Sequence, residues 1–220
     1  MSSASFVSQA SRKALAVAAL ATVAAAPAWS ANLFVNGSFE SPGGSYFALP
    51  AASTFITGWT TVLTGVEYFR PNDFGLVAAA DGVMAVDLAN LVFSSGGLEQ
   101  TVATTAGQSY DVSFYAGSSL SSGRDGTGIV KVSIDGGSPL SFDTAVANSA
   151  TLTWALRDFS FVATGGSTTI RFWNDQNANL HFADIDGLSL TASAVPEPGT
   201  WALMAAGLAG LTMCARRRKA

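Results

Sequence analysis

"IVKVSIDGGSPLSFD", at Ile129–Asp143, is the stretch of the chain that most directly indicates a fold. Its first half alternates apolar and polar residues, which is typical of a strand with one face in a core and the other in solvent. Asp135-Gly136-Gly137 then supplies a tight turn before a second short run. The stretch therefore predicts a β-hairpin and, with it, an antiparallel sheet.

The same alternation recurs along the whole middle of the chain. Turn signals such as Asp81-Gly82 and Gly165-Gly166 separate the runs, and no run has the period of an amphipathic helix. The pattern predicts an all-β, two-sheet sandwich in a single domain. The expected strands are 32–39, 58–63, 83–88, 110–116, 129–134, 156–163, 168–173 and 185–190.

Composition and charge exclude several classes of protein. Hydrophobic residues make up 49% of the 220 residues, which is too many for a disordered chain. The middle region carries five basic and 14 acidic residues, a net charge of −9, and such a surface repels the phosphates of nucleic acids. Cys214 is the only cysteine, so the chain forms no internal disulfide.

The N-terminus has the order of a secretory signal peptide. Arg12 and Lys13 precede a run of small apolar residues, and Ala28-Trp29-Ser30 offers a small-x-small cleavage site. We expect residues 1–30 to be a signal peptide that signal peptidase removes. Residues 31–192 then form the folded domain, and residues 193–220 form a tail.

That tail has three parts in order. Val195-Pro196-Glu197-Pro198 is stiff and extended because of its two prolines. The apolar run 201–215 follows, and its 15 residues make about 22 Å of helix, which is short for a bilayer core of ~30 Å. Arg216, Arg217 and Arg218 would stay on the cytoplasmic side. We therefore expect a short transmembrane helix that enters the inner membrane transiently.

These three parts resemble the PEP-CTERM sorting tail of Gram-negative bacteria. The resemblance implies processing by an exosortase, export across the inner membrane, and a final place at the cell surface or in the extracellular matrix of a biofilm. It also implies an association with exopolysaccharide. An ordinary single-span anchor is the alternative reading of the same residues.

The middle region resembles the choice-of-anchor C domains. The resemblance rests on the order of "NLFVNGSFE" (32–40), "ADGVMAVDL" (80–88), "GGLEQTVATTAGQSYDVSFYAG" (96–117) and "FADIDGLSL" (182–190). It implies a galactose-binding-like jelly roll, similar to carbohydrate-binding modules, whose first and last strands lie close together.

The same resemblance implies a structural calcium ion near those two strands, and no organic cofactor. Calcium takes about 6–8 oxygen ligands, so Glu40 and Asp186 are its expected side-chain ligands, with Asp184 as a further one. Solvated turn carboxylates are the alternative.

Sugar binding needs an exposed aromatic face beside planar hydrogen-bonding groups. Trp173 followed by Asn174, and Tyr68 preceded by Glu67, have this composition, so these four residues are the predicted ligand-binding residues. The alternative for Trp173 is a buried aromatic residue at the end of a strand.

Catalytic signatures are missing from the sequence. His181 is the only histidine, and the chain has neither a Gly-x-Ser-x-Gly elbow nor a glycine-rich phosphate loop. We predict a non-catalytic exported protein that binds extracellular polysaccharide and no nucleic acid. A matrix protein without specific sugar binding is the alternative, and a glycan hydrolase using paired carboxylates is less favoured.

Overall fold

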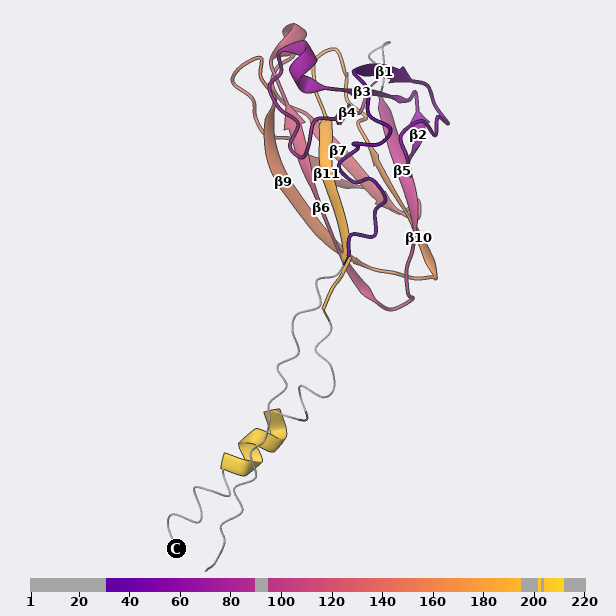
Figure 1. Ribbon diagram of the computed structural model, residues 1–220, viewed down its shortest axis with the longest axis vertical. Coiled ribbons are helices and arrows are strands. Elements are labelled where there is room, and N and C mark those ends of the chain that lie inside the picture. Colours follow the sequence, from indigo (N-terminus) through magenta and orange to yellow (C-terminus); the bar gives the residue numbers. More distant parts are fainter. Residues whose placement is uncertain (1–30, 90–94, 195–201, 203, 212–220) are drawn as a thin grey trace, which may run out of the picture.

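The computed structural model describes residues 31–89, 95–194, 202 and 204–211, and its strands form two antiparallel sheets packed face to face (Figure 1). Sheet A has the order β1 (Tyr46–Leu49), β3 (Val66–Phe69), β4 (Ala85–Asp87), β11 (Asp184–Ala192), β6 (Ser109–Ser118) and β9 (Thr153–Val162). Sheet B has the order β2 (Thr60–Leu63), β5 (Gly96–Ala103), β10 (Ser167–Trp173), β7 (Ile129–Ile134) and β8 (Leu140–Asp143). The predicted jelly-roll β-sandwich is confirmed.

The hairpin at Ile129–Asp143 forms as predicted, because β7 and β8 pair antiparallel from Ile129↔Asp143 to Val132↔Leu140. Three strands were not among those expected: β1, β3 and β5. β1 and β3 have only four residues each, too few to establish a period, and β5 begins with Gly96-Gly97, which suggests a turn.

The expected strand at 32–39 is wrong. Asn36 and Phe39 adopt positive φ angles of 56° and 59°, which interrupt an extended conformation. The segment is instead fastened to β11 by the side chain of Asn32, whose Nδ2 donates to the Leu188 carbonyl at 2.8 Å and whose Oδ1 accepts from the Leu190 N–H at 2.9 Å. The first segment and the last strand lie together as the resemblance implied.

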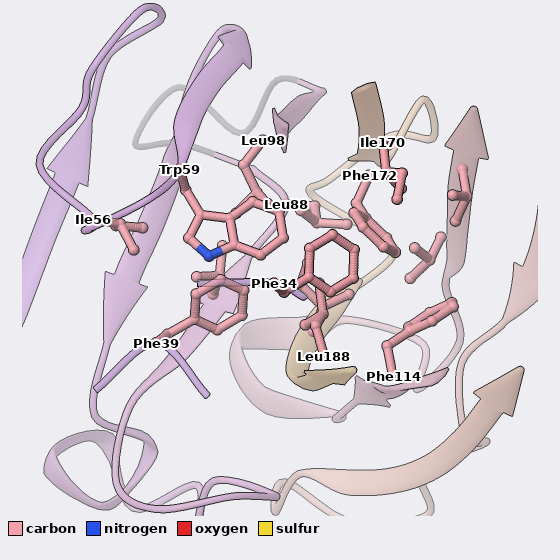
Figure 2. Close-up of a cluster of buried hydrophobic side chains, with 14 of the residues drawn as sticks. Phe34, Phe39, Ile56, Trp59, Leu88, Leu98, Phe114, Ile170, Phe172 and Leu188 are labelled. Carbon is pink, nitrogen blue, oxygen red and sulfur yellow. The ribbon is translucent and has the colours of Figure 1, made fainter. Parts of the chain in front are cut away.

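Aromatic and aliphatic side chains together fill the space between the sheets (Figure 2). The ring of Trp59 lies 5.2 Å from Phe34 and 6.3 Å from Phe172, and Phe172 lies 5.3 Å from Phe114. Trp59 also donates from Nε1 to the Asn36 carbonyl at 3.1 Å. Among the described residues, the buried members of this core run from Phe34 to Leu190, and we call residues 31–194 the domain.

The domain has two distinct ends (Figure 1). The first described residues and the last residues of β11 lie at one end, where the chain enters and leaves the sandwich. The short 3₁₀ helices η1 (Pro71–Phe74) and η2 (Ser121–Gly123) lie at the other. Any tail that continues from β11 therefore starts at the end opposite η1 and η2.

Residues 202 and 204–211 are helical. Within the described part of the chain, no helix has the length and apolar character that crossing a membrane requires. The expected signal peptide, and several residues of the expected membrane helix at 201–215, lie outside the described residues.

Replacing Trp59 by alanine tests the core. Trp59 is 2% exposed and packs the first segment on Phe172 of sheet B, so Trp59→Ala should lower the free energy of unfolding by ~3–5 kcal/mol. Urea denaturation of the domain measures this change. Leu156→Ala, at a side chain that is 53% exposed, serves as the control and should change the stability by less than ~0.5 kcal/mol. Equal losses in the two variants would contradict the assigned core.

Candidate functional site

Three carboxyl groups lie in one row across the outer face of sheet A. Glu67 on β3 is in register with Asp87 on β4, and Asp87 is in register with Asp184 on β11. Successive residues of a strand face opposite sides, so Tyr68 and Ile185 enter the core while these three carboxyls face outward. We call Glu67, Asp87 and Asp184 the carboxyl row.

A pocket of about 340 Å³ lies on this face, beside the carboxyl row. We call it the outer pocket. Phe74 of η1 is 51% exposed and contacts Tyr46 and Phe69 with ring centroids 5.4 and 5.9 Å away. Glu67 and Arg124 supply charged groups to the wall. The residues lining the pocket are Tyr46, Glu67, Phe69, Phe74, Leu76, Ser121, Ser122, Arg124 and Phe182.

Arg124 connects the pocket to the carboxyl row. Its guanidinium carbon lies 3.8 Å from the centre of the Phe182 ring, and its Nε donates to the Ala178 carbonyl at 3.2 Å. Its positive charge lowers the pKa of Glu67, Asp87 and Asp184, opposing the effect of burial. Arg124 is therefore held on several sides and presents a fixed charge at the pocket wall.

Burial is the largest cause of the pKa shifts in the carboxyl row. It raises the pKa of Asp87 to about 8, with a further rise from the negative charge of Glu67. Burial, followed by the charge of Asp87, raises the pKa of Asp184 well above its ordinary value. Neither carboxyl oxygen of Asp184 has a hydrogen-bond partner among the described residues. The buried pair is therefore most stable when it holds protons.

Glu67 is half-buried, and its carboxylate bonds to the hydroxyl of Tyr46. Burial raises the pKa of Glu67, whereas that hydrogen bond lowers it. The pKa of Tyr46 rises to about 12, because of burial first and the charge of Glu67 second. Of the four residues predicted to bind a ligand, Glu67 is the one that lines the outer pocket.

The prediction that Tyr68 presents an exposed aromatic face is wrong. Tyr68 is fully buried in the core, where its hydroxyl donates to the Phe39 carbonyl at 2.6 Å and accepts from the Gly43 N–H at 3.0 Å. Glu67 and Tyr68 are adjacent in a strand and so face opposite sides of the sheet. They cannot contact the same ligand.

Trp173 is the last residue of β10 in sheet B and Asn174 follows it, whereas Glu67 is on sheet A. Trp173 is half-buried and lines a separate hollow on the outer face of that sheet. Asn174 is fully buried, and its Oδ1 accepts from the Gln176 N–H at 2.8 Å. The prediction that its amide is available to a sugar is therefore wrong.

Glu40 and Asp186, the expected calcium ligands, bind backbone N–H groups instead. Glu40 Oε1 accepts from the N–H groups of Val83 and Met84, both at 2.8 Å. Asp186 Oδ2 accepts from the Asp81 N–H at 2.7 Å, and Oδ1 accepts from the N–H of Gly187 at 2.6 Å. The two carboxyls thus fasten the loop before β4 from both sides.

Asp184, the third expected ligand, belongs to the carboxyl row and faces Asp87. In the described part of the chain, no three His, Cys, Asp or Glu side chains are placed to hold a metal ion together. Glu40, Asp184 and Asp186 therefore do not fit the calcium site that the resemblance implied.

His181 does not have the geometry of a catalytic triad. Its Nδ1 lies 3.3 Å from Asp125 Oδ2 and 3.2 Å from Thr127 Oγ1. In a triad the carboxylate and the nucleophile occupy different ring nitrogens, so that one nitrogen is oriented while the other moves the proton. Here the same nitrogen faces both groups, and the Thr127 hydroxyl donates to Asp125 at 2.8 Å.

The fold and the outer pocket together define a jelly-roll domain with an aromatic-lined hollow on one sheet. The chain belongs to the family described as "Protein of unknown function (DUF642)", which matches residues 32–183. Residues 194–219 match the PEP-CTERM protein-sorting motif, so the resemblance of the tail is confirmed. This motif is that of an exported protein. The predicted sorting residues lie outside the residues that the structure describes; they are Val195, Pro196, Glu197, Pro198, Arg216, Arg217 and Arg218.

Several solved structures are similar to the chain. The structure of TmCBM61 in complex with β-1,4-galactotriose is 21% identical, with a TM-score of 0.44, and the match covers 74% of this chain and 100% of that one. The CBM22-1 xylan-binding domain from Paenibacillus barcinonensis Xyn10C is 15% identical, with a TM-score of 0.43 and coverages of 69% and 94%.

A longer protein, the arabinose-bound α-L-arabinofuranosidase MgGH51, is 12% identical with a TM-score of 0.50. The match covers 76% of this chain and 27% of that one. At 12% identity, the similarity to this structure supports the fold alone. No curated protein matches the sequence.

Most of the pocket was not predicted from the sequence. Phe74, Arg124 and Phe182 come from loops that fold over sheet A, and no periodic pattern marks loop residues as neighbours. The outward direction of Asp87 could have been predicted, because the alternation of "VMAVDL" places Asp87 and Val86 on opposite faces of the strand. Its burial depends on the covering loops and was not predictable.

The raised pKa values predict how stability depends on pH. An unfolded aspartate titrates near pH ~3.9, so between about pH 4 and 8 Asp87 holds a proton in the folded domain that it has lost in the unfolded chain. The contribution of this proton to the free energy of unfolding is complete below about pH 4 and is lost as the pH rises through about 8. Asp184→Asn removes the charge and offers an amide to Asp87, so it should stabilise the domain at pH 8 by ~1–2 kcal/mol.

Urea denaturation at pH 5 and at pH 8 measures both effects. Asp158→Asn, at an exposed position of β9 in the same sheet, is the matched control and should leave the slope with pH unchanged. A loss of stability in Asp184→Asn at pH 8 would mean that the carboxylate of Asp184 is required, and would contradict the proposed protonation.

Proposed function

We propose that this protein is an exported, non-catalytic carbohydrate-binding protein of the cell surface or extracellular matrix. The observation that carries the proposal is the outer pocket, where aromatic rings surround the Glu67 carboxylate and the Arg124 guanidinium. A sugar offers the matching chemistry, because its C–H faces stack on aromatic rings and its hydroxyls bond to planar charged groups. The partner is extracellular polysaccharide.

Phe74 supplies the stacking surface. It is half exposed, and Tyr46 and Phe69 support its ring from below. Glu67 accepts hydrogen bonds from sugar hydroxyls, while Ser121 and Ser122 can donate or accept at the rim. The volume of about 340 Å³ is at the small end of ligand pockets, which span ~300–1,000 Å³. The pocket thus suits a short part of a sugar chain.

The position of the pocket fits an exported, tail-sorted protein. The sorting motif begins at residue 194, just after β11 ends at Ala192, whereas η1 and η2 beside the pocket lie at the opposite end of the domain (Figure 1). In this proposal signal peptidase removes residues 1–30 and an exosortase processes the tail. The pocket thus lies at the end of the domain distant from the start of the tail.

Affinity electrophoresis tests the proposal. The domain is run through native gels that contain soluble galactan, xylan, mannan or hydroxyethyl cellulose, and we expect retardation by at least one of them. Phe74→Ala and Glu67→Gln should each weaken binding at the outer pocket about tenfold, or ~1.4 kcal/mol. Phe55→Ala removes another exposed ring (40%, against 51% for Phe74) outside the pocket and is the control.

Retardation that persists unchanged in both pocket variants would place sugar binding elsewhere. No retardation by any of the four glycans, nor by exopolysaccharide of a bacterium that carries such sorting tails, would contradict sugar binding and favour a matrix protein without it.

A further inference from the structure

A second hollow, of about 330 Å³, lies on the outer face of sheet B. Trp173 and Arg171 line it from β10, Ser133 from β7 and Leu63 from β2, and the turn between β7 and β8 closes one side. We call it the tryptophan hollow. It shares no lining residue with the outer pocket.

Gly97 packs tightly against Trp173. The two residues are in register on β5 and β10, and a Cβ on Gly97 would lie 2.7 Å from Trp173 Cβ and 2.5 Å from the Phe172 carbonyl oxygen. Glycine within a strand weakens the strand and marks the close approach of another group. The backbone of β5 therefore packs directly on Trp173 at a position that has no room for a side chain, and Trp173 itself is half-buried.

The charged groups around the tryptophan hollow are already paired. Arg171 Nη2 lies 2.7 Å from Glu99 Oε2, and Lys131 Nζ lies 3.3 Å from Asp175 Oδ2. Lys131 and Arg171 flank Trp173 on β7 and β10. The hollow thus contains one large aromatic side chain, and the positive charges near it are neutralised by ion pairs. Such a surface suits an uncharged, hydroxyl-rich ligand.

The two hollows face opposite directions. Tyr68 on β3 and Phe172 on β10 both enter the core between the sheets. Their neighbours Glu67 and Trp173 therefore lie on the outer faces of sheet A and sheet B. One short sugar segment cannot reach both, because the whole sandwich stands between them.

We propose that the tryptophan hollow is a second site for uncharged polysaccharide, and that one domain therefore cross-links two sugar chains. This inference rests on the proposed function of the outer pocket and extends it, because it makes the protein a connector of a matrix. Two weak sites on one domain also raise the overall affinity for a network of chains.

Light scattering during titration tests the cross-linking. The domain is added to dilute solutions of galactan, xylan, mannan or hydroxyethyl cellulose, one at a time. With a glycan that retards the domain in gels, scattering should rise at least tenfold at intermediate ratios and fall again when polysaccharide is in excess. Scattering of the domain alone over the same concentrations measures self-association.

Trp173→Ala should remove the rise in scattering and keep the retardation that depends on Phe74. Phe74→Ala should also remove the rise, whereas the double variant should lose retardation altogether. Trp173→Phe keeps an aromatic face and should restore part of the scattering, and thermal melts confirm that each variant is folded.

The outcomes separate the two proposals. Retardation of the wild type without a rise in scattering, or a full rise in a folded Trp173→Ala, would overturn the cross-linking and leave the proposed function standing. An absence of retardation with every glycan would remove the proposed function itself.

Discussion

The lateral pairing of β3, β4 and β11 is the constraint on which the other features depend. Val86 and Ile185 are in register and enter the core, while Asp87 and Asp184, also in register, face outward one residue away. One set of strand contacts therefore builds the hydrophobic interior and the carboxyl row together. Because β11 is a central strand of sheet A, a shift of one residue would place aspartates in the core.

The sequence predicted the features that follow from alternation. The two-residue period of the strands and the turns between them were sufficient for the jelly roll and for the hairpin at 129–143. The two-residue period gives a wrong prediction where a side chain makes hydrogen bonds that the backbone makes in a strand. Asn32 bonds to β11 through its side chain, so 32–39 has the sequence pattern of a strand without forming one. Tyr68 is a residue type that often stacks on sugars, but its position in the strand directs its side chain into the core.

The site was harder to predict, because loops complete it. Glu67 was identified, whereas Phe74, Arg124 and Phe182 reach the outer pocket through the tertiary fold. The contacts of the acidic residues expected to hold calcium were hard to predict for a similar physical reason. Carboxylates beside a first segment and a last strand can bind a cation or backbone N–H groups, and only the position of the loop at Asp81–Met84 shows that Glu40 and Asp186 do the latter.

The central claim is that the outer pocket binds sugar, and an NMR titration of the isotope-labelled domain tests it most directly. Galactotriose, xylotriose, mannotriose and cellotriose are added in turn while the backbone amide resonances are followed. We predict that one of them shifts the resonances of Tyr46, Phe74, Ser121 and Ser122, the residues around the pocket. Resonances that stay in place around the pocket with every sugar, including any sugar that shifts residues elsewhere, would contradict the claim.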